Sequence, residues 1–159
     1  MKVYLTVHAE AITPSSVFVE IAAPLVEHPR GWKELSVVQS PDAADSIVTL
    51  TPNAVIATMF PQFEKDKLSV CDMLTQAVWI NEDRWRRNLP DDSQLPLAAY
   101  RAYVLQHELG HALGHTHATP CTKKGDAAPI MIQQTLGIGK CSPNPFPTSN
   151  ELANQNAPK

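Results

Sequence analysis

One stretch of eleven residues constrains this chain more than any other: residues 107–117 are His-Glu-Leu-Gly-His-Ala-Leu-Gly-His-Thr-His. In an α-helix, residues four apart lie on the same face. We therefore expect the imidazoles of His107 and His111 to point side by side, where they can share one metal ion. At about 100° per residue, Glu108 falls on the flank of that face, close enough to touch a water molecule on the ion without binding the ion itself.

A third ligand requires the helix to end. If the helix continued, a residue eight positions after His107 would lie about 12 Å along the axis, which excludes His115. The helix can end at Gly114, because glycine adopts positive φ freely and commonly ends helices. The chain can then turn and bring His117 back toward the metal. A catalytic zinc ion takes three protein ligands and keeps one open position, so the sequence predicts one Zn2+ ion. Its predicted ligands are His107, His111 and His117.

The pattern of apolar residues predicts the surrounding elements. The ligand helix is expected over residues 94–114, capped by Asp91, Asp92 and Ser93, with Pro96 in its first turn. A helix is expected over 14–28, which Pro24 would kink or end early. Strands are expected over 2–8, 34–39, 45–51, 68–71 and 77–81, and residues 53–66 are ambiguous. Residues after 117 resist regular structure, and 148–159 are expected to be a flexible tail.

The eleven-residue string resembles the signature of the metzincin zinc peptidases, within the wider zincin superfamily. Members of this group have a Met-turn, a tight turn whose methionine lies beneath the zinc-binding histidines, and Ala128-Pro129-Ile130-Met131 fits that place. The resemblance implies that Met131 is the Met-turn methionine, that Gly114 is the turn glycine and that Glu108 is the general base. The alternative for Met131 is an ordinary core methionine.

Residues 129–137, 141–147 and 81–85 are also similar to a small, poorly characterised family of metzincin-like proteins from actinobacteria. The similarity covers roughly residues 70–147. It implies an α+β, zincin-like fold, with a twisted mixed β-sheet, a backing helix and an active-site helix, in a single catalytic domain over residues 1–147.

The relatives pair cysteines in similar places, which implies a disulfide between Cys121 and Cys141, with free thiols as the alternative. Cys71 would then be unpaired, and either buried or partly reactive. Zinc binding by thiolates is a competing idea, but three histidines already fill the protein positions. A disulfide would favour an extracellular or other oxidising compartment, although the polar start of the chain is not that of a signal peptide.

The predicted activity is zinc-dependent endopeptidase cleavage, in which Glu108 takes a proton from the zinc-bound water. Two alternatives stay open: a non-catalytic, zinc-containing peptide-binding module, and a zinc hydrolase of another amide or ester. The expected partner is a peptide or protein substrate, which could pair with the strand near 68–71. Two neighbours stay ambiguous, since His115 is either a donor to a ligand or an exposed bystander, and Tyr103 either lines the cleft or packs in the core.

Composition excludes other classes of protein. The 159 residues, 43% of them apolar, suit one domain with a core, which we expect to be monomeric. The net charge of −3, without a basic stripe, disfavours nucleic-acid binding, and the cluster Arg84, Arg86 and Arg87 is interpreted as a solvated strand end. No apolar run approaches 18 residues, so no membrane span is expected.

Overall fold

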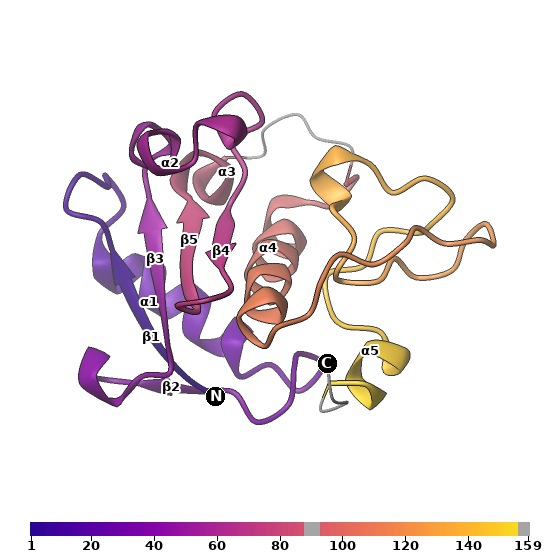
Figure 1. Cartoon of the computed structure of the whole chain (residues 1–159), viewed down its shortest axis with the longest axis horizontal. Coiled ribbons are helices and arrows are strands. Elements are labelled where there is room, and N and C mark those ends of the chain that lie inside the picture. The colour runs from indigo at the N-terminus through magenta and orange to yellow at the C-terminus, as the bar shows by residue number, and fades with distance from the viewer. Residues whose placement is uncertain (88–92, 156–159) are drawn as a thin grey trace.

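A computed structural model describes residues 1–87 and 93–155. Its centre is a five-stranded sheet in the order β2-β1-β3-β5-β4 (Figure 1). The strands are β1 (Lys2–Val7), β2 (Ser36–Val38), β3 (Ser46–Thr51), β4 (Val70–Asp72) and β5 (Ala77–Asn81). Neighbouring strands are parallel except β4, which runs antiparallel to β5 at one edge. The chain is therefore an α+β protein with a mixed sheet, as the sequence predicts.

Alternation of apolar residues determines which face of the sheet is buried. Leu5 of β1 pairs with Val48 of β3, which pairs with Val78 of β5, and all three side chains are buried on one face. Ile47, which precedes Val48 in β3 and points to the opposite face, is 40% exposed. Period-two alternation is the signature of a sheet with one covered face.

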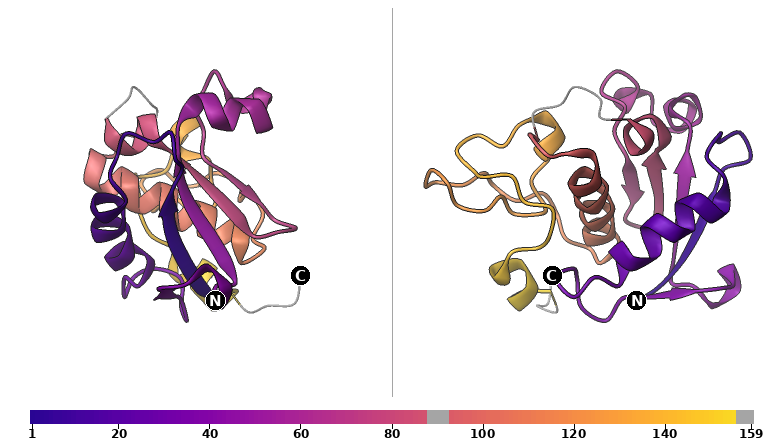
Figure 2. Two further views of the ribbon diagram at one scale, coloured as in Figure 1. Left: turned by 90° about the vertical axis from the view of Figure 1, so that its left-hand side faces the viewer. Right: turned by 180° about the vertical axis from the view of Figure 1, so that it is seen from behind.

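Two helices cover that face, α1 (Ser15–Val26) and α4 (Leu97–Ala112) (Figure 2). Helix α1 buries Phe18, Ala22 and Val26, which recur every four residues. The sequence predicted a helix over 14–28 that Pro24 would kink or end early; the helix passes Pro24 and ends at Val26, two residues before the expected end. The burial of Ala22 and Val26 on either side of Pro24 offsets the single helical hydrogen bond that proline removes.

Several elements differ from the sequence prediction. The ambiguous stretch forms α2 (Asn53–Met59), and α3 (Glu82–Arg86) follows β5 directly, capped by the side chain of Asn81. The predicted solvated cluster lies in and after α3, not at a strand end, and only Arg86 and Arg87 are exposed. Arg84 is 8% exposed, and its guanidinium donates twice to the carbonyl of Asp66. A charged side chain buried in this way needs such acceptors.

The ligand helix begins three residues later than predicted, at Leu97, with Pro96 at its N-cap. Ser93 does not cap it, since its Oγ accepts from the backbone N–H of Leu95. The predicted capping residues Asp91 and Asp92 lie outside the described residues. Proline at this position fits the helix start, because its fixed φ suits entry to a helix.

The segment after α4 is irregular but ordered around a second, smaller apolar cluster. This cluster is formed by Ala128, Ile132, Ile138 and Cys141. A disulfide joins Cys121 to Cys141, as the resemblance implied. Among the described residues, no helix is long and apolar enough to cross a bilayer.

The structure differs from the expected tail over residues 148–159. Helix α5 (Ser149–Ala153) forms there, and Leu152 packs against the main core. Thr148 and Glu151 make a reciprocal capping box, in which each side chain binds the other residue's backbone N–H. Residues 156–159 lie outside the described part of the chain.

We expect the disulfide to stabilise this irregular region. It closes a loop with a sequence separation of 20, for which chain entropy gives about 3 kcal/mol of free energy of unfolding. A Cys121→Ser/Cys141→Ser protein should lose about that amount in chemical denaturation. Cys71→Ser is the control, since it leaves the disulfide in place. Equal stability of the double variant and wild type would contradict the prediction.

Candidate metal site

Helix α4 and the bend after it bring the predicted ligands together. His107 is buried and His111 is half-buried, one turn apart on the helix. Gly114 adopts a φ of 84°, the left-handed region that other residues avoid. Its N–H donates to the carbonyl of His111, and the N–H of His115 donates to the carbonyl of Gly110, so the helix ends in a compact turn. The predicted bend at Gly114 is present.

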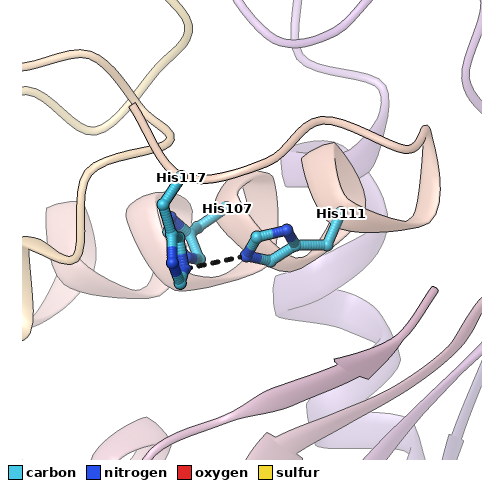
Figure 3. Close-up of side chains that lie close together, drawn as sticks. All are labelled: His107, His111 and His117. Atoms are coloured by element: carbon cyan, nitrogen blue, oxygen red, sulfur yellow. Dashed lines mark hydrogen bonds between the residues drawn. The ribbon is translucent and has the colours of Figure 1, made fainter. Parts of the chain in front are cut away.

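The chain then returns alongside the helix and places His117 over the first two imidazoles (Figure 3). The ligand atoms of His107, His111 and His117 all lie within 4.8 Å of one another. The Nε2 atoms of His111 and His117 are 3.1 Å apart. Two imidazole nitrogens on one tetrahedral zinc ion would lie roughly 3.3 Å apart, given Zn–N distances near 2.0–2.1 Å. The His111–His117 pair matches that spacing, and the three side chains together lie close enough to hold one metal ion.

Main-chain carbonyls determine which nitrogen each helical imidazole offers. Nδ1 of His107 is 2.7 Å from the carbonyl oxygen of Ile130, and Nδ1 of His111 is 2.7 Å from that of His115. A carbonyl oxygen only accepts, so each Nδ1 must carry the proton and donate it. In both rings the lone pair is then on Nε2, the atom directed toward the other histidines. This is the arrangement by which proteins orient imidazole ligands.

The imidazoles are also held in the neutral form that a metal requires. Burial lowers the pKa of His107 to about 3, although the hydrogen bond to Ile130 opposes that shift. Burial likewise lowers the pKa of His111. At neutral pH no proton on Nε2 of His107 competes with a cation, which favours metal binding.

Glu108 lies beside the triad in the wall of a cavity of about 210 Å3. Its side chain is 5% exposed, and burial raises the pKa of its carboxyl group to about 8. The same cavity is lined by all three histidines and by apolar side chains from α4, from β4 and from the segments before and after β4. These apolar residues include Phe63, Leu68, Val70, Met73 and Val104. A buried carboxyl group with a raised pKa, in a cavity next to potential metal ligands, is typical of a functional site.

Met131 lies in a tight turn, closed by a hydrogen bond from the N–H of Ile132 to the carbonyl of Pro129. The side chain is 2% exposed and packs against Gly110 of α4. A β-carbon on Gly110 would lie only 2.3 Å from the Met131 sulfur, so the close approach depends on glycine. The N–H of Ala118 donates to the carbonyl of Met131, which ties the turn to the segment that carries His117.

The two ambiguous neighbours of the ligands have specific contacts. His115 contributes its carbonyl oxygen to His111, while its imidazole stacks on Trp32 with ring centroids 4.5 Å apart. Tyr103 lines the cavity, yet it is 3% exposed, and its hydroxyl donates to the carbonyl of Ile132 and accepts from the N–H of Gln134. Tyr103 thus connects the ligand helix to the loop after Met131.

Sequence reasoning missed the carbonyl acceptors and the position of Cys71. Any residue type supplies a carbonyl, so no sequence signal could identify those of Ile130 and His115. Cys71 of β4 is half-buried and lines the cavity. Burial, with the nearby carboxyl groups of Glu108 and Asp72, raises the pKa of its thiol to about 12, so it stays protonated at neutral pH.

The fold and the site together define an α+β protein with a histidine triad that can hold a metal ion. The chain belongs to the family described as protein of unknown function DUF3152, which matches residues 2–156. Comparisons with curated proteins and with solved structures found no match. The function of this family is unknown, so the chemistry of the chain can be inferred only from the geometry of its site.

The bend at Gly114 can be tested by substitution. Gly114→Ala forces a side chain into the left-handed region at a cost of about 1–2 kcal/mol, and relief of that strain would move His117 away from the triad. We expect lower stability and weaker zinc binding, measured by denaturation and by competition with a chelator. Gly114→Asn is the matched control. It should lose less stability and less zinc affinity than Gly114→Ala, because asparagine tolerates this conformation. An alanine variant equal to wild type in both measurements would contradict the prediction.

Proposed function

We propose that this protein is a zinc-dependent endopeptidase of the metzincin type. The observation that carries the proposal is the convergence of three imidazoles, two of them with Nε2 fixed as the free nitrogen by carbonyl acceptors, beside a buried carboxyl group in a cavity. A structural zinc site would have no need of the adjacent carboxyl group, and such sites more often use four ligands, many of them cysteines.

In this proposal His107, His111 and His117 hold the ion. Zinc supplies a Lewis acid that polarises a carbonyl group and makes water more acidic. The residues present suit that role, because three neutral imidazoles leave the cation with its full charge and one open position. The resemblance to metzincins further implies that Met131 is the Met-turn methionine, and its packing against Gly110 between two ligands supports that assignment.

Glu108 is proposed as the general base. Its carboxylate takes a proton from a water molecule in the cavity and passes that proton to the nitrogen of the leaving amine. Burial alone raises its pKa to about 8, and positive charge held by the neighbouring imidazoles would favour the carboxylate form. A carboxyl group with a pKa near neutral is suited both to accept and to return a proton.

The substrate is proposed to be an extended peptide with an apolar side chain in the cavity. Strand β4 is at the edge of the sheet, and its residues Val70 and Cys71 line the cavity. A free sheet edge can pair with an extended chain through backbone hydrogen bonds. The mixed sheet with an antiparallel edge strand, the backing helix α1 and the ligand helix α4 are consistent with a zincin-like fold.

Metal content tests the first part of the proposal. Purified wild-type protein should bind one zinc ion per chain, and His111→Ala should lose it, because two imidazoles hold the ion far more weakly than three. His8→Ala is the matched control, since that histidine lies outside the triad on the loop after β1. Elemental analysis after dialysis against zinc provides the measurement. Equal zinc content in wild type and His111→Ala would refute the triad as the metal site.

Glu108→Gln tests the catalytic role. The variant should keep its zinc and lose about 10²–10⁴-fold in the rate of peptide cleavage, because glutamine cannot accept the proton. A peptide library digested with and without chelator provides the measurement, and Glu20→Gln on the exposed side of α1 is the control. Cleavage that is lost on chelation and restored by zinc supports the peptidase. Peptide binding without cleavage would indicate a binding module, and hydrolysis of other amides or esters alone would indicate a different zinc hydrolase.

A further inference from the structure

Glu151 of α5 binds the turn that carries Met131. One carboxylate oxygen, Oε1, accepts from the backbone N–H of Met131 at 3.0 Å. The other, Oε2, accepts from the backbone N–H of Ile130 at 3.0 Å and from Thr148, whose N–H and hydroxyl lie 2.8 and 2.7 Å away. One side chain thus satisfies four donors and links the C-terminal segment to the metal site.

The geometry connects this carboxylate to a metal ligand through a single peptide group. The N–H of Met131 and the carbonyl of Ile130 belong to the same peptide unit, which is planar and rigid. Glu151 holds the N–H end of that unit, and Nδ1 of His107 donates to the carbonyl end at 2.7 Å. Any tilt of the peptide plane at one end therefore moves the acceptor of His107 at the other.

The same arrangement acts electronically. Hydrogen bonds in a chain polarise one another, so a carboxylate that accepts from the N–H makes the carbonyl of the same unit a stronger acceptor. A stronger acceptor on Nδ1 raises the basicity of Nε2, as a carboxylate does when it contacts a ligating histidine directly. Ile130 and Met131 are 0% and 2% exposed and Glu151 is half-buried, so these contacts are partly shielded from solvent.

We propose that Glu151 is a positioning residue of the metal site, which orients and polarises the Ile130–Met131 peptide group and through it the ligand His107. This inference rests on the proposed metal site but not on the identity of the substrate. It also assigns a role to the C-terminal helix α5.

The structure allows Glu151 to be tested without undocking α5. The helix has a second anchor, because the side chain of Gln155 accepts from the N–H of Lys33 and donates to its carbonyl, both at 2.8 Å. Leu152 adds apolar packing against the core. Glu151→Gln keeps the size of the side chain but loses the charge, and it turns an NH2 group toward one of the two backbone donors.

The experiment measures zinc affinity by competition with a chromophoric chelator. Glu151→Gln should weaken zinc binding about tenfold or more, and Glu151→Asp, whose side chain is too short to reach the turn, should do the same. The control Gln155→Ala removes the second anchor of α5. It keeps the contacts of Glu151 to the peptide group and should stay within about twofold of wild type. Cobalt-substituted protein adds a spectroscopic signature, since an altered ligand geometry in Glu151→Gln should change the visible absorption.

The outcomes separate the two proposals. If wild type binds zinc through the triad and Glu151→Gln binds it equally well with an unchanged cobalt spectrum, the role of Glu151 is refuted and the metal site stands. If wild type binds no zinc, the metal site itself is refuted, and this inference with it. Should both Glu151 variants fail to fold, wild type still provides a test: the amide protons of Ile130 and Met131 must exchange slowly with solvent, and rapid exchange would overturn the inference.

Discussion

The interaction on which the site depends is the hydrogen bond from Nδ1 of an imidazole to a main-chain carbonyl, made by both helical histidines. Without these bonds each ring could carry its proton on either nitrogen. With them, both rings present Nε2 to the same point. The two carbonyls have different origins, since that of His115 comes from the bend after α4 and that of Ile130 from the loop beyond it. The site therefore requires the helix end and the loop to be in place together.

The irregular segment between α4 and α5 lacks a β-ladder over most of its length. Buried polar contacts satisfy its backbone groups instead. Gln134 donates through its side-chain amide to the carbonyl of Asn144 and accepts from the N–H of the same residue. The amide of Asn144 also donates to the carbonyl of Ala128. Buried main-chain groups need partners, and here side-chain amides provide them where a neighbouring strand would in a sheet. With the disulfide, these bonds hold an irregular segment in one arrangement, which is what a ligand-orienting carbonyl requires.

The sequence could predict those features that depend on particular residue types at particular positions. Alternating apolar residues predicted β1, runs rich in β-forming residues predicted the other strands of the sheet to within a few residues, and the glycine at 114 predicted the bend. The order of the strands in the sheet and the carbonyl acceptors have no such signal. Helix α5 did have one: Thr148 and Glu151 stand at capping-box spacing. The prediction of a flexible tail followed the polar composition of residues 148–159 instead. Composition does not show which backbone donors the Glu151 carboxylate binds. Arg84 was misjudged for the same reason, since its acceptor is a backbone carbonyl.

The cavity lies where the sheet, the ligand helix and the segment after that helix meet. Its walls come from β4, from α4 and from the loop, as the lining residues Val70, Val104 and Gln133 show. The three histidines and Glu108 lie on or beside α4, and the helix is tied to the core by buried contacts. The segment after α4 supplies Gln133, which is half-buried, and Thr135, which is buried, to one wall of the cavity. The peptide group between Ile130 and Met131 is where the two meet, because it belongs to the loop and yet orients a ligand of the helix.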